Sequence, residues 1–294
     1  MRKRNEVVWV WRWENESIVV GVERRGSGPT ILMLPALSSI STRGEMLPLQ
    51  DRLGDRFTTV AVDWPGFGER SRPRLDWRPE MLRAFLADLL ANNAIEKPYA
   101  TIAAGHAAAY ALAHAAENPG ALGKLCLLAP TWRGPLPTMA NKRSPLFGRL
   151  CRIGDQPLIG RGLYRLNVNR AVVRMMARRH VYSDPHWLTA DRLVPKLAVV
   201  RAPGARHASF RFVTGGLDPA QSREDFLETA LRVKDPVFVV YGAETPPKSM
   251  AEMEALVDLA NVGAARRPKG RLSLHEEFPD DVAASLSDFL QWKT

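Results

Sequence analysis

The stretch TIAAGHAAAYALAHAA, residues 101–116, decides the fold of this chain. A short apolar run ends at Gly105, and an alanine-rich segment typical of a helix follows at once. We therefore expect a buried strand, a sharp turn and a helix. Small side chains around such a turn let the strand and the helix approach each other closely.

The same alternation of apolar strands and helices continues on both sides of this stretch. Strands joined by helices predict a mainly parallel, twisted sheet of about eight strands with helices on both faces. The first two strands are separated only by the polar turn ENE, so we expect them to be antiparallel. The predicted strands cover residues 6–13, 17–26, 30–35, 57–62, 99–105, 124–130, 236–242 and 262–268.

Three tryptophans alternate with other residues in the first strand, at Trp9, Trp11 and Trp13. A period of two places them on one face, which we interpret as a buried face or an oligomer contact. An aromatic binding stripe is the alternative. Among the helices, residues 41–53 begin with a capping signal, in which Glu45 is placed for a capping box.

Residues 134–234 break the alternation and predict an inserted helical cap over a core of residues 1–133 and 235–294. The insertion contains 18 Lys/Arg and 7 Asp/Glu, a balance of +11, and the whole chain carries +10. This basic surface favours anionic partners, either an acidic protein or an anionic membrane. Nucleic acid is not expected, since no nucleic-acid-binding signature is present.

The two cysteines, Cys126 and Cys151, form no CxxC pair and have no histidine at metal-ligand spacing. We expect no disulfide framework, no metal and, without a glycine-rich phosphate loop, no nucleotide cofactor. No apolar run approaches the length of a transmembrane helix or of a signal peptide. The expectation is a cytoplasmic protein, with peripheral membrane contact as an alternative.

Four segments in this order resemble the α/β-hydrolase fold. They are DWPGFGERSRP (63–73), AAGHAAAYAL (103–112), PVFVVYGAETPP (236–247) and GRLSLHEEFPDDVAASLSDFL (270–290). The resemblance covers the predicted core and puts the insertion in the place of the family's cap. It implies a serine on the strand–helix elbow, an acid after the penultimate strand and a histidine before the last helix.

This sequence departs from the family's catalytic pattern at each position. Read as Gly-x-Ser-x-Gly, the elbow has Ala107 where the nucleophile belongs. The acid position is Thr245, with Glu244 one residue before it. The histidine position is Leu272, and His275 follows three residues later. Serine-type ester hydrolysis through Ala107 is therefore excluded, because a methyl group cannot attack a carbonyl.

We derive three hypotheses. The first is a degenerate hydrolase-like protein that binds a small apolar or acidic carbonyl-containing ligand, or a partner protein, with Leu37, Ser38, Ala107 and Ala108 around the ligand. The backbone N–H groups of Leu37 and Ala108 would remain as oxyanion donors. The second is a hydrolase or lyase in which His106 and a water act as general base, with Glu244 and His275 as further candidate catalytic residues.

The third hypothesis is a module that docks on an anionic membrane or an acidic protein. It rests on residues 170–182, where Val172, Val173, Met175 and Met176 lie among arginines. A basic amphipathic helix of this kind can lie on anionic lipid. The alternative is a cap helix whose apolar side packs on the rest of the cap.

Overall fold

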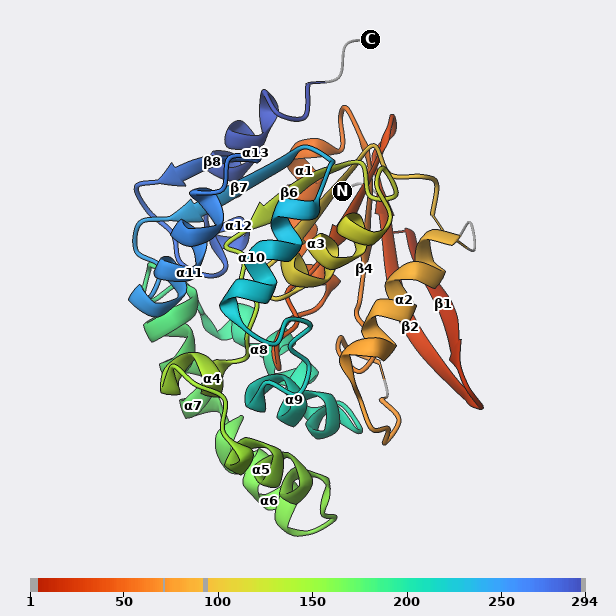
Figure 1. The fold of residues 1–294 in the computed structure, drawn as a ribbon. Helices are drawn as coiled ribbons and strands as arrows, with labels where there is room; N and C mark the ends of the chain where they lie inside the picture. The colour runs from red at the N-terminus through yellow and green to blue at the C-terminus, as the bar shows by residue number, and fades with distance from the viewer. Residues whose placement is uncertain (1–4, 71, 92–94, 292–294) are drawn as a thin grey trace.

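The computed structural model describes residues 5–70, 72–91 and 95–291 and is built around one eight-stranded sheet (Figure 1). The strand order is β1-β2-β4-β3-β5-β6-β7-β8. β1 is antiparallel to β2 and the sheet is mainly parallel, as the sequence predicts; β2 is also antiparallel to β4, which the sequence did not indicate. The strands are β1 Asn5–Trp13, β2 Glu16–Arg25, β3 Thr30–Leu34, β4 Thr58–Val62, β5 Ala100–Ala104, β6 Lys124–Leu128, β7 Val237–Gly242 and β8 Val262–Arg267.

Helices cover both faces of the sheet. One face carries α2 (Pro79–Ala91), α3 (Ala107–Glu117), α10 (Arg223–Arg232) and α11 (Pro247–Val257); the first three stand in front of the sheet in Figure 1. The other carries the 3-10 turn η1 (Arg43–Met46), α1 (Leu47–Leu53), α12 (Leu274–Glu277) and α13 (Pro279–Ser287). Because both faces are covered, every residue of β3, β4 and β5 is buried.

The alternating tryptophans of β1 face α2. Trp11 is buried, its ring contacts Phe85 edge-on at 5.4 Å, and its indole N–H donates to Asp88 at 2.8 Å. Trp9 lies against the same phenylalanine ring, at 5.4 Å between centroids. The expectation of a buried face is confirmed for these two side chains. The apolar periodicity of residues 78–94 also predicts a helix, and the structure has α2 there; residues 92–94 lie outside the described residues.

Between β6 and β7 the chain forms a series of helices that project from the carboxyl end of the parallel strands, at the bottom of Figure 1. They pack around two small apolar cores of their own. The last helix of the insertion, α10, instead packs on α3 and α11 and so helps to cover the sheet. The helices preceding it are α4 Pro135–Ala140, α5 Pro145–Asp155, α6 Ile159–Asn167, α7 Arg170–Met176, the π-helical turn η2 Ala177–Val181, α8 Ala190–Arg201 and α9 Ala205–Thr214.

The capping prediction at residues 41–53 is half right. Thr42 is the N-cap, since its hydroxyl accepts a hydrogen bond from the N–H of Gly44 at 3.0 Å. Glu45 does not close a capping box, because its carboxylate turns to the loop after β3. Within the described part of the chain, no helix has the length and apolarity needed to cross a membrane.

Candidate functional site

The strand–helix turn at the centre of the sheet has its strained position at Gly105. β5 ends at Ala104, α3 begins at Ala107, and Gly105 between them has a left-handed φ of 52°. A Cβ built on Gly105 would lie 3.1 Å from the Cβ of Ala36, so the elbow contacts the loop after β3. The structure therefore corrects the expected register: Ala107 is the first residue of the helix and not the strained residue of the turn.

The predicted oxyanion donor on the helix is also displaced. The N–H of Ala108 donates to the carbonyl of Gly105 at 3.2 Å, in the turn that starts α3. In the loop after β3, Leu37 is buried. Ser38 is half-buried, and its hydroxyl lies 2.9 Å from that of Ser41. Ala107 and Ala108 have no exposed surface, so they lie in the core of the molecule.

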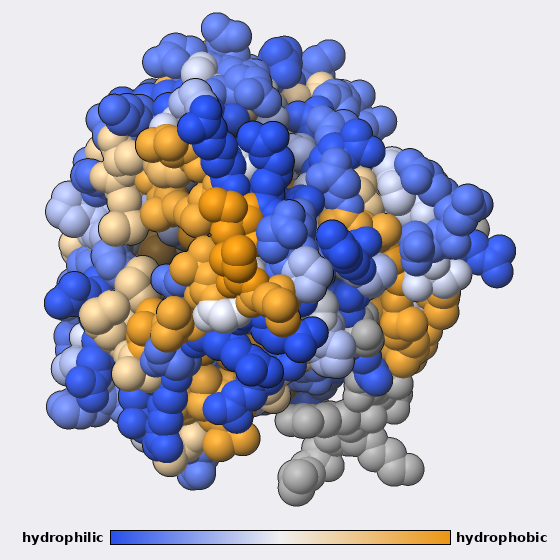
Figure 2. Space-filling model, turned by 90° about the horizontal axis from the view of Figure 1, so that it is seen from below, coloured by the Kyte–Doolittle hydropathy of each residue, from blue (hydrophilic) through white to orange (hydrophobic). Residues whose placement is uncertain are grey.

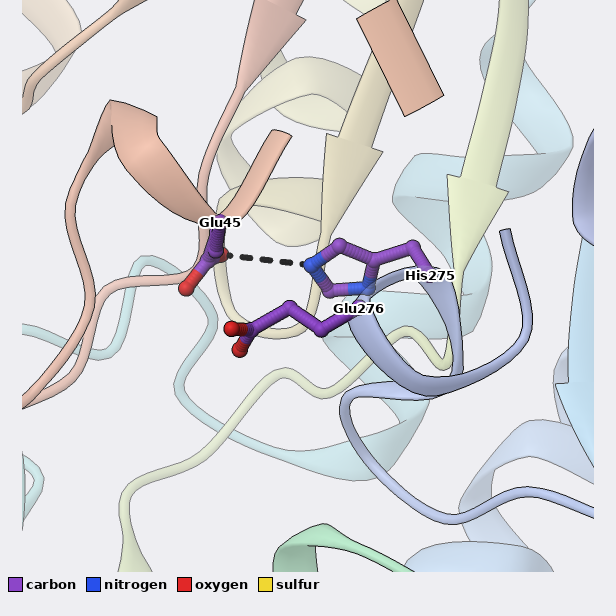
Figure 3. A group of neighbouring side chains, drawn as sticks. All are labelled: Glu45, His275 and Glu276. Atoms are coloured by element: carbon purple, nitrogen blue, oxygen red, sulfur yellow. Dashed lines mark ion pairs between the residues drawn. The ribbon is translucent and has the colours of Figure 1, made fainter. Parts of the chain in front are cut away.

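Glu45 and His275 form a buried pair next to this loop (Figure 3). The Glu45 carboxylate accepts the N–H of Ala36 at 2.5 Å and lies 3.6 Å from Nε2 of His275. Burial by itself raises the pKa of Glu45, but His275, Lys196 and the Ala36 N–H together hold that pKa below its usual value. Neither ring nitrogen of His275 has a hydrogen-bond partner in the structure. Ala36 joins this pair to the elbow, because it contacts Gly105.

Glu276 connects this pair to the cap. Its carboxylate accepts a hydrogen bond from the Tyr182 hydroxyl at 2.9 Å and pairs with the Lys196 ammonium at 2.8 Å. Donor atoms of Glu45, His275 and Glu276 all lie within 4.8 Å of one another, as a metal site would require. The ammonium of Lys196 already neutralises Glu276, so the donor set fits a charge network better than a divalent cation.

His106 points to the other side of the elbow, toward the end of the cap. Its Nε2 lies 3.1 Å from the carbonyl oxygen of Leu217 and 3.5 Å from Oδ1 of Asp218. Its ring packs edge-on against Phe212 of α9, with centroids 5.6 Å apart. Burial lowers the pKa of His106 to about 4, so the imidazole is neutral at physiological pH.

Asp218 is a buried carboxyl group that the sequence did not single out. It accepts the N–H of Gly134 at 2.8 Å and lies 3.4 Å from the Arg143 guanidinium. Burial raises the pKa of Asp218 to about 7, and the charge of Arg143 only partly offsets that effect. The raised pKa favours the protonated form of Asp218, which lies next to a neutral histidine.

Arg143 also lines a cavity of about 330 Å³ between the carboxyl end of β6 and the first turn of α10. Its lining holds three arginines, Arg133, Arg143 and Arg223, and one acid, Glu252. The Glu252 carboxylate pairs with Arg133 at 3.2 Å and with Arg223 at 3.3 Å. The cavity thus has an excess of positive charge. The lining residues are Trp132, Arg133, Asn141, Arg143, Gln221, Ser222, Arg223 and Glu252.

Of the three candidate catalytic residues, the structure places two in the interior. His106 and His275 are buried, and each contacts a carboxylate. Glu244 is exposed in the turn after β7 and so occupies the position of a surface acid. The hydroxyl of Thr245, at the position expected for the acid, is buried and has no hydrogen-bond partner among the described residues.

Known proteins resemble this chain mainly in fold. Cfl2 from Burkholderia cenocepacia superimposes with a TM-score of 0.75 at 20% identity, over 97% of this chain and 95% of the other. The haloalkane dehalogenase DatA from Agrobacterium tumefaciens C58 gives 0.72 at 18% identity, over 98% and 97%. At these identities the likeness establishes the fold alone.

A 2-(acetamidomethylene)succinate hydrolase from Mesorhizobium japonicum is 36% identical over 90 residues. That match covers 31% of this chain and 28% of the relative, so the chain aligns with less than a third of the relative's length. The model of the alpha/beta hydrolase family matches residues 31–285, which include the sheet from β3 onward, the cap and α13 up to residue 285. The chain therefore belongs to the α/β-hydrolase family.

Proposed function

We propose that this chain binds a small anionic ligand with a carboxylate or carbonyl group and does not carry out serine-type hydrolysis. The proposal rests on the arginine-lined cavity. Arg143 of this cavity contacts Asp218, and Asp218 in turn contacts His106 beside the elbow. An acidic side chain of a partner protein is an alternative occupant of the same cavity.

The elbow itself supports a non-covalent role. The strained position that the family uses for its nucleophile corresponds to Gly105, which has no side chain, and the helix then begins with the methyl group of Ala107. Neither residue can form an ester with a substrate. A catalytic triad acts as a unit, so loss of the nucleophile alone removes most of the rate.

The other two family positions support the same reading. Thr245 follows β7 where an acid is expected, and a threonine hydroxyl cannot hold an imidazolium as a carboxylate does. Leu272 follows β8 where the base is expected, and its side chain accepts no proton. We infer that the site has left serine chemistry at all three positions.

The charge of the cavity favours an acidic ligand. A guanidinium presents several N–H donors in a planar fork, so an arginine that already contacts one carboxylate keeps donors for a second. Arg143 and Arg223 are both exposed at the rim, so a ligand carboxylate can reach them. The volume of about 330 Å³ lies at the lower end of the range for small-molecule sites.

An enzyme without a covalent step is the second candidate, in which a histidine activates water. His275 fits this role better than His106. Within the described part of the chain, neither of its ring nitrogens has a hydrogen-bond partner, and the Glu45 carboxylate 3.6 Å away can stabilise an imidazolium. His106 has Nε2 against a carbonyl and a pKa of about 4, which makes it a weak base. Water would have to reach His275, which is fully buried.

Calorimetry with succinate and with sulfate tests the binding proposal. We expect Arg143→Gln combined with Arg223→Gln to weaken binding by roughly tenfold or more, because two charge-assisted contacts are lost. Arg232→Gln is the matched control, since Arg232 is exposed at the far end of α10. Absence of binding of both anions to the wild-type chain, or an equal loss in the control, would reject the proposal.

Turnover of p-nitrophenyl butyrate separates binding from catalysis. We expect no release above the buffer rate and no acyl adduct in the mass of the intact protein. Hydrolysis that survives in His106→Ala and disappears in His275→Ala would instead support the water-activating pair. An acyl adduct on any residue would contradict both candidates.

A further inference from the structure

The tip of the cap exposes apolar side chains where a water-soluble helical hairpin would hide them. α5 and α6 pack on each other and on α9, and the turn between them carries Leu158 with 84% of its surface exposed. The neighbouring exposed fractions are 66% for Ile159, 70% for Leu166, 64% for Leu146 and 41% for Ile153. Figure 2 views the molecule from the side of this hairpin and shows hydrophobic side chains gathered on that face, with hydrophilic ones around them.

The inner side of the hairpin packs against α9. Tyr164 of α6 packs with Ala205 and Phe210 of α9 in a small core. Gly154 and Gly160 allow the helices to touch, because a Cβ on Gly160 would lie 2.1 Å from the carbonyl oxygen of Gly154. The exposed leucines and isoleucines therefore take little part in the packing of the cap. A cluster of this kind marks an interaction surface.

The charged residues of the segment that contains this apolar tip are nearly all basic. Residues 141–180 contain ten Lys/Arg and a single acid, Asp155. The charge of Asp155 is already paired within the cap, because its carboxylate lies 2.8 Å from Arg211 and 2.6 Å from His207. Of the basic side chains on the hairpin, Arg149, Arg152, Arg161 and Arg165 are exposed.

We propose that the α5–α6 hairpin docks on an anionic lipid surface, with its apolar tip in the headgroup region and its arginines at the lipid phosphates. Apolar side chains surrounded by arginines on one helical surface are the pattern of interfacial membrane binding. The surface differs from the one expected from residues 170–182, where Val173 and Ala177 are buried within the cap. This inference does not depend on the ligand in the arginine-lined cavity.

Flotation with vesicles tests the proposal. We expect the wild-type chain to bind phosphatidylcholine vesicles that contain phosphatidylglycerol, to bind pure phosphatidylcholine weakly, and to dissociate at about 0.5 M salt. Arg161→Gln with Arg165→Gln should weaken binding on the order of 10- to 30-fold. Leu158→Ser with Ile159→Ser should weaken it by at least about tenfold.

Matched controls carry the same changes elsewhere on exposed surface. They are Arg201→Gln with Arg232→Gln for the charges, and Val194→Ser with Leu231→Ser for the apolar side chains. Circular dichroism would verify that all variants are folded. No binding to anionic vesicles at low salt overturns the proposal, and so does equal loss in the hairpin variants and the controls. Unchanged succinate binding in the hairpin variants would separate this result from the proposed ligand site.

Discussion

The neighbouring groups His106 and Asp218 should give the stability of this protein two opposing dependences on pH. The pKa of Asp218 is raised to about 7 from an ordinary value of 3.8, because the carboxyl is buried. The folded state therefore holds this proton more tightly than the unfolded state. Stability from Asp218 is present at low pH and is lost as the pH rises from about 4 to about 7.

His106 acts in the other direction. Burial lowers its pKa to about 4 from 6.5, so the folded state resists protonation. Stability from His106 is present above the unfolded value and is lost as the pH falls from about 6.5 to about 4. Between pH 4.5 and 7, the two pKa shifts correspond to a loss of about 3 kcal/mol from Asp218 and a gain of about 2 kcal/mol from His106. In the wild-type chain the two contributions oppose each other.

Substituting one of the two residues at a time should reveal how the other one makes stability depend on pH. Relative to wild type, the free energy of unfolding of Asp218→Asn should increase by about 3 kcal/mol between pH 4.5 and 7, and that of His106→Gln should decrease by about 2 kcal/mol. Urea unfolding followed by tryptophan fluorescence at the two pH values measures both differences. Asp258→Asn is the control, because that aspartate is exposed after α11. Differences of the same sign in the two variants, or none beyond the control, would refute the reasoning.

Three further predictions concern the elbow, the Glu45 pair and the cavity. Gly105→Ser should lower the free energy of unfolding by about 1 kcal/mol, because the left-handed φ favours glycine, and should not create esterase activity, since Leu272 and Thr245 supply neither base nor acid. Glu45→Ala should cost roughly 3 kcal/mol in urea unfolding, because it leaves His275 and the Ala36 N–H without a carboxylate, whereas exposed Glu228→Ala should cost little. Sulfate should bind more weakly at pH 8 than at pH 6, because ionised Asp218 competes for Arg143, and Asp218→Asn should remove that difference in a calorimetric titration.

Periodicity alone was enough to predict the sheet. The buried strands β3 and β5 are uninterrupted apolar runs, and the alternating tryptophans of β1 mark the face that α2 covers. The sequence placed the nucleophile position of the elbow at Ala107, two residues after Gly105, where the structure has it, and this error has a physical reason. Residues 103–109 are alanines apart from Gly105 and His106, so small residues fit the motif in more than one register. Only the backbone conformation of Gly105 distinguishes them.

The charged partners of the site could not be predicted from spacing. Glu45 has the position of a capping-box residue in the sequence, but its carboxylate is drawn to the Ala36 N–H and to His275, which is 230 residues away along the chain. Asp218 stands alone in the insertion and meets His106 only through the packing of the cap on the core. Long-range pairs of this kind depend on tertiary structure, and local patterns carry no trace of them.

The two buried acids near the elbow have opposite electrostatic roles, and this decides the side from which an anion can approach. Ala36, which follows β3, holds Glu45 on one side of β5, and Gly134, which follows β6, holds Asp218 on the other. Glu45 stays ionised and buried, because His275, Lys196 and the Ala36 N–H lower its pKa, so the positive groups on that side are already paired with a carboxylate. Asp218 is largely protonated below pH 7 and adjoins Arg143, so an anion meets net positive charge there. An acidic ligand should therefore enter from the β6 side, where the arginine-lined cavity lies, and a substitution that neutralises Glu45 should affect stability more than affinity.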